Sequence, residues 1–227
     1  MSTENSNRDL TIELVLTIAV PAVTLMFLSS EDRLGPALGL IVALLGPLSH
    51  GTYTMVQSRT VSPIAVVALA GVLLTGGVGL LELDPAWIAV KEGLIPTVMG
   101  VGLIGSTRTD YHLLAKVLDR ILDSEKVHAS LDDKDASSHY EASLDQNTVY
   151  GGLLFIAAGV ASFVLCRYMV VSDAGTEAFN TELGTFTAVS FGVISIPLAL
   201  GLTLLLSRVL NVLEEHAGVK VDELLRK

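Results

Sequence analysis

The sequence predicts an all-α membrane protein with six transmembrane helices that pair as three hairpins. Hydrophobic residues make up 51% of the chain and charged residues only 17%, below the roughly 25% typical of a soluble domain. The apolar residues fall in stretches of about 20, the length that crosses a hydrocarbon core. The basic residues are concentrated in alternate connecting segments, as expected for a chain that crosses a membrane repeatedly.

Six apolar segments account for the predicted helices. They cover residues 11–29, 35–57, 61–83, 85–106, 148–171 and 178–208. The acidic turns "SSEDRLG", "ELDP" and "SDAGTEAFNTELG" close the three pairs. The second and third hairpins share an aromatic residue near a helix start, an acidic residue inside and then an apolar run, in "PAWIAVKEGLIPTVMGVG" and "EAFNTELGTFTAVSFGVI". Three such hairpins could form a parallel repeat about a pseudo-threefold axis.

The distribution of Lys and Arg predicts that both termini are cytoplasmic. The set of segments that includes both ends carries eleven basic residues, whereas the opposite set carries only Arg33. The eleven are Arg8, Arg59, Arg108, Lys116, Arg120, Lys126, Lys134, Arg208, Lys220, Arg226 and Lys227. The polar N-terminus has no cleavage site after an apolar run, which favours a retained first helix over a signal peptide.

This orientation divides the chain into five parts. Residues 1–10 form a cytoplasmic N-terminal tail, and residues 11–106 contain transmembrane helices 1–4. Residues 107–146 form a cytoplasmic amphipathic helix and an acidic loop, residues 147–208 contain helices 5 and 6, and residues 209–227 form a cytoplasmic C-terminal tail.

Within the cytoplasmic part, "YHLLAKVLDRILDS" has apolar residues at 113, 114, 117, 118, 121 and 122, the stripe of an amphipathic helix. Such a helix lies either on the inner membrane surface or on the protein's own cytoplasmic ends. Residues 124–146 are polar and acidic, and we expect them to be solvated and partly mobile. The tail is predicted to extend the sixth helix, break at Gly218 and end in a short amphipathic turn.

Two charged residues lie about two turns inside the predicted fourth helix. Consecutive residues project about 100° apart on a helix, so Lys91 and Glu92 are not expected to pair with each other. Lys91 shares a face with Trp87, which allows a cation–π contact, and its long side chain can also reach the outer headgroups. Glu92 is shorter and needs a partner on another helix, or a proton.

Candidate partners lie at the same depth. Arg167 is near the outer end of the fifth helix, and Asn180 and Glu182 are near the outer start of the sixth. Charges at membrane depth cost roughly 2.5–3.5 kcal/mol each, so they should face inward and pair. We name this set the outer polar layer: Trp87, Lys91, Glu92, Arg167, Asn180 and Glu182. It is either an ion-pair clamp that holds three helices in register or part of a cavity or transport route.

Other intramembrane residues are weaker candidates. Pro21, Pro47, Pro96 and Pro197 predict kinks in four helices, and the glycines of "AGVLLTGGVGLL" predict a closely packed third helix. In "PLSHGTY", His50 and Tyr53 could relay protons with Glu13 on the first helix, or be structural.

Several function classes are disfavoured. A net charge of −10 argues against a nucleic-acid partner, and the single cysteine, Cys166, excludes an internal disulfide and a cysteine-based metal site. The sequence has no P-loop, zinc-hydrolase, nucleophile-elbow or dinucleotide motif. We therefore predict no catalytic, cofactor-binding or metal-binding residues, no cofactor, and a non-enzymatic protein. The expected partners are the lipid bilayer and either another copy of the chain or other membrane proteins.

The segments "LLTGGVGLLELDPAWIAVKEGLIP" and "SDAGTEAFNTELG", with the order of helices around them, resemble the VC0807-type family of bacterial six-helix inner-membrane proteins. This resemblance covers essentially the whole chain. A more distant one, to the intracellular septation protein A (YciB-type) family, depends on Gly76-Gly77 and on the step from Trp87 to Lys91. That family tends to have Lys at the corresponding step of its last hairpin, where this chain has Leu183.

The resemblance implies a multi-pass protein of the bacterial inner membrane with an envelope- or septation-related scaffold or interaction role. The alternative is a small oligomeric transporter or channel that uses the outer polar layer as a substrate or proton site.

Overall fold

The computed structural model describes residues 15–58, 63–109, 113–118, 122–131, 134–217 and 220–224. In these ranges the chain forms helices joined by turns, and no β-strand. The all-α prediction is confirmed. Four of the described helical segments are long and apolar enough to cross a membrane: Gly35–Tyr53, Ala86–Ser106, Ser137–Met169 and Glu177–His216. They are consistent with a multi-pass membrane protein. A shorter apolar helical segment covers Ala70–Leu80.

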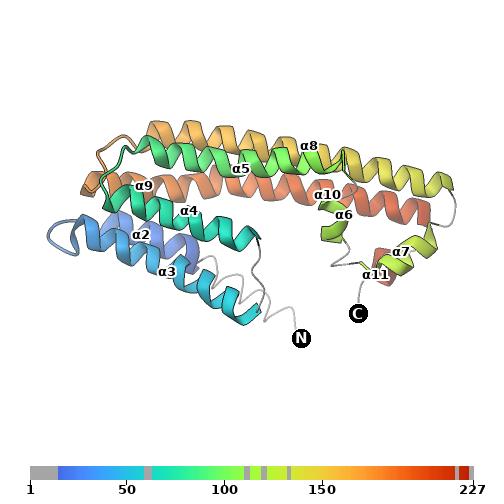
Figure 1. Ribbon diagram of the computed structural model, residues 1–227, viewed down its shortest axis with the longest axis horizontal. Helices are drawn as coiled ribbons and strands as arrows, with labels where there is room; N and C mark the ends of the chain where they lie inside the picture. The colour runs from blue at the N-terminus through green and yellow to red at the C-terminus, as the bar shows by residue number, and fades with distance from the viewer. Residues whose placement is uncertain are drawn as a thin grey trace. The chain divides into compact units, whose positions relative to one another are not determined.

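The chain divides into two compact units, which we name unit 1 (Met1–Ile95 and Ala161–Ile194) and unit 2 (Pro96–Val160 and Ser195–Lys227). Helices α5 (Ala86–Ser106) and α8 (Lys134–Met169) each contribute residues to both units. Unit 1 also contains η1 (Val15–Ala19) and four helices labelled in Figure 1: α2 (Val20–Phe27), α3 (Gly35–Ser58), α4 (Pro63–Leu80) and α9 (Glu177–Ser190).

In unit 1, a tight turn after α2 returns the chain as α3. Gly35 begins α3 with a φ of 73°, a left-handed conformation that glycine adopts without steric cost. Helix α9 packs against α2 where Gly184 meets the backbone of Ala22. The core of unit 1 includes Phe179, Leu40 and Ile88, all fully buried.

The close packing predicted for the third helix is present along α4. A side chain at Gly76 would overlap Leu44, and one at Gly79 would overlap Leu40 on α3. Gly77 faces open space. Two of these three glycines therefore allow α3 and α4 to approach closely.

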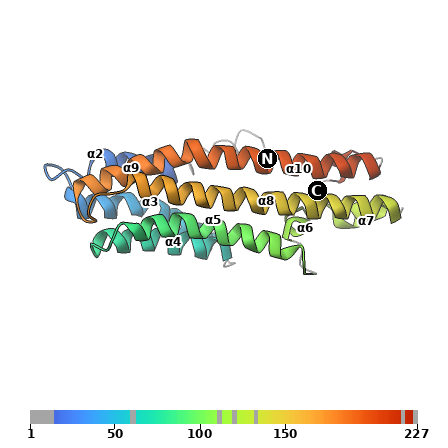
Figure 2. The same ribbon diagram turned by 90° about the horizontal axis from the view of Figure 1, so that it is seen from above.

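Unit 2 contains the second half of α5, α6 (Leu113–Leu118), α7 (Ser124–Ser130), most of α8, α10 (Ile196–Ala217) and α11 (Val221–Leu224). Figure 2 shows α5, α8 and α10 as long neighbouring helices. Within unit 2, Gly100 on α5 and Gly152 on α8 meet, and Gly201 on α10 contacts Leu154 on α8.

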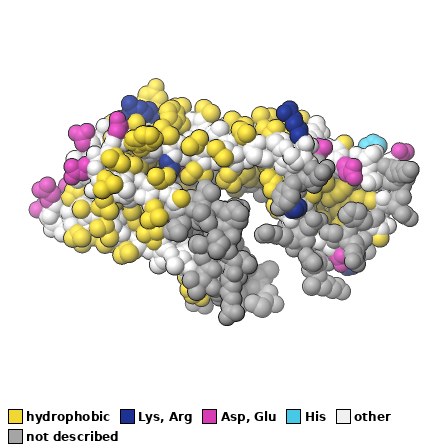
Figure 3. Space-filling view, viewed as in Figure 1, with side chains coloured by type: hydrophobic (Ala, Val, Ile, Leu, Met, Phe, Trp, Pro, Cys, Tyr) yellow, Lys and Arg dark blue, Asp and Glu magenta, His cyan; other side chains and the backbone are white. Residues whose placement is uncertain are grey.

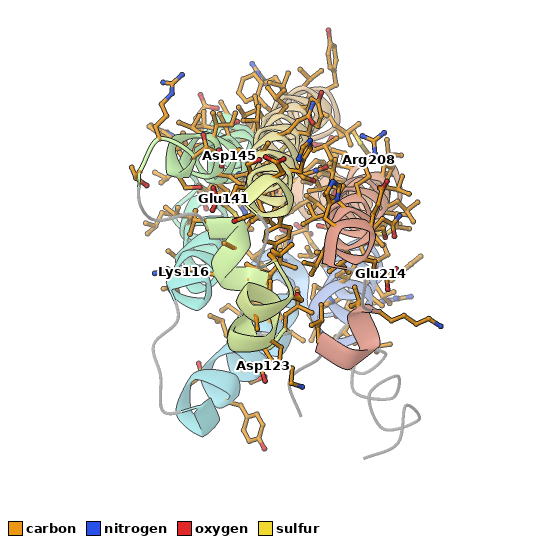
Figure 4. All side chains as sticks on the ribbon, turned by 90° about the vertical axis from the view of Figure 1, so that its right-hand side faces the viewer. Lys116, Asp123, Glu141, Asp145, Arg208 and Glu214 are labelled. Atoms are coloured by element: carbon orange, nitrogen blue, oxygen red, sulfur yellow. The ribbon has the colours of Figure 1, made fainter. Side chains whose placement is uncertain are left out.

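A second apolar cluster fills unit 2 where α6, α7 and α11 join α8 and α10. Its buried members are Leu118, Leu122, Val127, Leu144, Val209, Leu213 and Leu224. The predicted amphipathic stripe contributes Leu118 and Leu122, and Leu114 packs beside them. This part of the stripe therefore packs on the protein itself, while Val117 of the same stripe is 52% exposed. Charged side chains surround the cluster, from α6 (Lys116), the residue before α7 (Asp123), α8 (Glu141, Asp145) and α10 (Arg208, Glu214) (Figure 4).

The described part of the acidic segment 124–146 is helical, and many of its side chains are exposed. It forms α7 and the first turns of α8, which starts at Lys134 rather than near residue 148. Residues 134–150 contain neither Gly nor Pro, the two strongest helix breakers, so the helix can extend beyond the apolar run.

The prolines predicted to kink helices lie inside helices or next to π-helical turns. Pro47 lies inside α3 and Pro96 inside α5, while Pro21 is the second residue of α2, which directly follows the π-helical turn η1. A π-helical turn, η2 (Phe191–Ser195), separates α9 from α10 just before Pro197. A wider turn relieves the clash between a proline ring and the carbonyl four residues earlier. As predicted, the sixth helix continues to Ala217 and a short turn of helix, α11, follows, whereas the predicted break at Gly218 lies outside the described residues.

Candidate functional site

The six residues of the outer polar layer all lie in unit 1. Trp87, Lys91 and Glu92 are on the first turns of α5, and Arg167 is near the end of α8. Asn180 and Glu182 are on α9. The structure gives them three separate sets of contacts.

The first set surrounds the amino group of Lys91. It donates a 2.7 Å hydrogen bond to the hydroxyl of Thr75 on α4 and lies 3.5 Å from the carbonyl oxygen of Gly71. It also forms a 2.6 Å ion pair with Glu92. The Thr75 hydroxyl in turn donates to the Gly71 carbonyl at 3.0 Å. Lys91 therefore joins α5 to α4, and its side chain is only 13% exposed.

The prediction that Lys91 and Glu92 do not pair is wrong. The 100° between consecutive residues separates the Cβ atoms, but the flexible lysine side chain is long enough to bring its amino group back to the neighbouring carboxylate. Trp87 is 61% exposed, and the Lys91 amino group is directed to Thr75 and Glu92. No ion pair joins Glu92 to Arg167 in the part of the chain that the structure describes.

The second set is centred on Glu182. Its carboxylate accepts hydrogen bonds from the backbone N–H groups of Val171 and Ser172, at 2.8 and 2.9 Å, and from the Ser172 hydroxyl at 2.7 Å. These donors belong to the turn that follows α8. Glu182 therefore fixes this turn to α9, a role that sequence reasoning missed because residues 172–176 offer no charged partner of basic sign.

Asn180 ties α9 to α3. Its side-chain amide donates a 2.7 Å hydrogen bond to the carbonyl oxygen of Pro36, and the residue is 1% exposed. The hydroxyl of Thr176 caps the start of α9 by accepting from the N–H of Phe179 at 3.1 Å. This end of α9 is thus held by a cap and by side chains that reach a neighbouring helix and turn.

The third environment is an open cleft of about 640 Å³ that contains Arg167. The turn between α4 and α5, the end of α8 and the turn after α8 form its walls. The lining residues are Glu82, Leu83, Asp84, Pro85, Arg167, Val171, Asp173 and Ala174. The sequence predicted an ion-pair layer around Arg167 but not this cleft, because the three carboxylates that line it, Glu82, Asp84 and Asp173, lie outside the apolar runs.

The weaker candidates are not brought to this site by described contacts. Glu13 lies outside the described residues, as does the side chain of His50, whose backbone belongs to α3. Tyr53 is 64% exposed on the same helix. The described residues include no group of three or more His, Cys, Asp or Glu side chains that could hold a metal ion.

The polar groups of the layer differ in their partners, and the buried Oδ1 of Asn180 receives no hydrogen bond from the described residues. Lys91 and Glu182 each have several protein partners, whereas the described residues provide Arg167 with no hydrogen-bond or ion-pair partner. Comparison of the chain with protein-family models, curated proteins and solved structures finds no match.

Proposed function

We propose that the chain is a non-enzymatic integral protein of the bacterial inner membrane with an envelope- or septation-related scaffold or interaction role. The observation that supports this proposal most directly is the use of the buried charges within the protein. The amino group of Lys91 is occupied by Thr75, Gly71 and Glu92, so it is not a ready binding group for a substrate. This arrangement favours the clamp interpretation of the outer polar layer.

A second support comes from unit 2. Its leucine cluster is covered by short helices and surrounded by charged side chains, as in a water-soluble domain. A folded module of this kind on a membrane protein provides a surface for other proteins. We place this module of short helices and leucines, but not the whole of unit 2, in the cytoplasm, as the positive-inside rule indicates.

The proposed topology keeps six spans, three hairpins and cytoplasmic termini. Site-specific labelling tests it with a cysteine-free background (Cys166→Ala). A cysteine at Asp32 should react with a membrane-impermeant maleimide in intact cells, whereas a cysteine at His139 should react only after permeabilisation. Labelling of both positions in intact cells would contradict this topology.

The function itself is tested by genetic complementation. The double variant Lys91→Met/Glu92→Gln removes the charged pair at similar volume. If the pair is a clamp, the variant should accumulate at wild-type abundance, or be rescued by growth at lower temperature, and restore the envelope phenotype of a strain lacking the gene. Glu177→Gln, on the exposed first turn of α9, is the control. Abundant protein that fails to complement would favour the transporter alternative.

The alternative, a small oligomeric transporter or channel, is favoured by one feature, the open cleft that contains Arg167. Flux assays in proteoliposomes distinguish the two proposals. A scaffold shows no flux of protons or monovalent cations above empty vesicles, and flux abolished by Arg167→Gln would support the transporter.

A further inference from the structure

We propose that the cleft around Arg167 is a binding site for a zwitterionic lipid headgroup of the phosphoethanolamine type, with the phosphate on Arg167 and the ammonium group among the carboxylates of Glu82, Asp84 and Asp173. This site goes beyond the proposed scaffold role and does not depend on it.

The cleft is built from two turns that are held in place. Glu182 binds the backbone of Val171 and Ser172, so the turn after α8 has a fixed course. Facing it, the carboxylate of Asp84 accepts a 2.8 Å hydrogen bond from the N–H of Ala86 at the start of α5. Both walls therefore have a hydrogen-bonded framework, which lowers the entropic cost of ordering a ligand.

The two turns also contact each other directly. Glu82 has a φ of 52°, which is uncommon for a residue with a side chain, and Gly175 has a φ of 84°. A Cβ added to Gly175 would lie 2.9 Å from the Cγ of Glu82, so the Glu82 side chain lies directly over the Gly175 backbone. A residue kept in a sparsely populated conformation by its surroundings is typical of binding sites.

The charges of the cleft indicate the ligand. One guanidinium (+1) and three carboxylates (−3) line the cleft, so its net charge is −2. A purely anionic ligand would be repelled by the three carboxylates, and a simple cation would leave the guanidinium unused. A ligand with one phosphate and one amine satisfies both, since guanidinium groups bind phosphate through two parallel hydrogen bonds.

The position of the cleft indicates that the ligand is a lipid. It lies where α8 ends at Met169 and α5 begins at Ala86. Trp87 and Tyr168, next to these helix ends, are 61% and 81% exposed. Exposed Trp and Tyr are enriched at the headgroup level of membranes. Figure 3 shows acidic side chains gathered at one end of unit 1 and apolar side chains over much of its visible face.

The same chemistry predicts an order of preference among headgroups. A primary ammonium donates three hydrogen bonds to carboxylates, whereas the quaternary ammonium of choline donates none. Phosphatidylglycerol has glycerol in place of the amine, so its negative phosphate would lie near the three carboxylates with no positive group of its own. We therefore expect phosphatidylethanolamine to bind best, phosphatidylcholine less well and phosphatidylglycerol worst.

Native mass spectrometry of the purified full chain tests this order. The protein is delipidated in detergent and titrated with each of the three lipids at equal acyl composition. Phosphatidylethanolamine should bind at one site per chain at least tenfold more tightly than phosphatidylglycerol. Arg167→Gln should weaken this binding by tenfold or more, and Arg208→Gln, an exposed arginine of unit 2, should leave it unchanged. Equal binding of all three lipids, or retention by Arg167→Gln, would overturn the proposal.

Removing the carboxylates tests the other half of the site. The double variant Glu82→Gln/Asp173→Asn keeps side-chain size and leaves the Asp84 cap intact. It should abolish the preference for ethanolamine over choline and raise phosphatidylglycerol binding. An unchanged preference contradicts the assignment of the ammonium group. Thermal unfolding of each variant, within a few degrees of wild type, excludes a general loss of fold.

A competition experiment separates the two possible sources of the headgroup. Soluble glycerophosphoethanolamine at millimolar concentration should displace only a minor part of the bound lipid, because the acyl chains add affinity. Full displacement at micromolar concentration would overturn the lipid assignment in favour of a soluble zwitterion. Because binding is measured on purified protein, this result is independent of complementation.

Discussion

Unit 1 and unit 2 are both helical and rich in leucine and glycine, but the contacts that join their helices differ. In unit 1, polar side chains connect neighbouring elements: Lys91 reaches α4, Asn180 reaches α3, and Glu182 reaches the turn after α8. Both units also have a buried apolar cluster and close glycine contacts: the cluster around Phe179 with Gly79 and Gly184 in unit 1, and the leucine cluster with Gly100 and Gly152 in unit 2.

Inside a hydrocarbon layer, apolar side chains gain little by leaving lipid for protein, so hydrogen bonds and close packing fix the arrangement of helices. A leucine cluster covered by charged residues gains stability from leaving water. What distinguishes unit 1 is that it adds these three directed polar contacts to its own apolar cluster and glycine packing.

The largest expected effect tests the leucine cluster. Leu213 is fully buried on α10, and Leu213→Ala should lower the free energy of unfolding by about 2–5 kcal/mol through lost burial and a cavity. SDS titration in mixed micelles, followed by circular dichroism, measures this. Leu204→Ala, on the same helix but 68% exposed, is the control and should change stability by less than about 0.5 kcal/mol. Equal losses would show that the cluster is not the stabilising element of unit 2.

The next effect tests the polar contacts of unit 1. Glu182→Ala removes the acceptor of three hydrogen bonds and leaves backbone donors of the turn without it, so we expect a loss of about 2–3 kcal/mol. Glu182→Gln should lose about half as much because the amide oxygen still accepts. The same micelle titration applies, with Glu177→Ala as the control. If Glu182→Ala is as stable as wild type, the turn is held by other contacts.

Two glycines on α5, Gly100 and Gly102, give a smaller expected effect with a matched control. Gly100→Ala places a methyl group against the backbone of Gly152, and overpacking of this kind costs about 1–3 kcal/mol. Gly102→Ala, two residues away on the same helix, meets open space and should be neutral or stabilising by up to about 1 kcal/mol. Thermal unfolding of the two variants side by side measures the difference. The same outcome for both would contradict the close approach of α5 and α8.

The smallest effect concerns one hydrogen bond. Thr75→Val keeps the volume of the side chain but removes the hydroxyl that binds Lys91, at a cost of about 1 kcal/mol. The hydroxyl of Thr203 bonds only to the Ala199 carbonyl of its own helix, so Thr203→Val should leave stability nearly unchanged. If the two variants do not differ, Lys91 contributes nothing through Thr75 to the packing of α5 on α4.

The sequence was sufficient for the helical class and for much of the apolar helix pattern. Hydropathy locates apolar stretches, and the helices Gly35–Tyr53 and Ala86–Ser106 match two predicted spans closely. It did not locate the start of α8, because a helix can extend beyond an apolar run: residues 134–147 are mostly polar but contain no Gly or Pro. Nor did the sequence indicate the π-helix η1, which covers residues 15–19 of the first predicted span before α2 begins at Val20.

The candidate site was predictable in composition and less so in contacts. All six residues of the outer polar layer fall in unit 1, but in separate sets of contacts rather than one layer of ion pairs. Partner choice was not predictable, since it depends on side-chain reach: Lys91 bends to its neighbour, and Glu182 reaches backbone donors that no sequence pattern marks. The cleft at Arg167 arises from two turns brought together by folding, which spacing alone does not reveal.

The anchoring of the turn after α8 has a practical consequence. Although this turn contains glycine and polar residues, its backbone is bound by Glu182 and packed beneath Glu82, so it should resist proteolytic nicking and reject inserted epitope tags. The turn between α2 and α3, with exposed Glu31 and Asp32, is the better place for a reporter sequence.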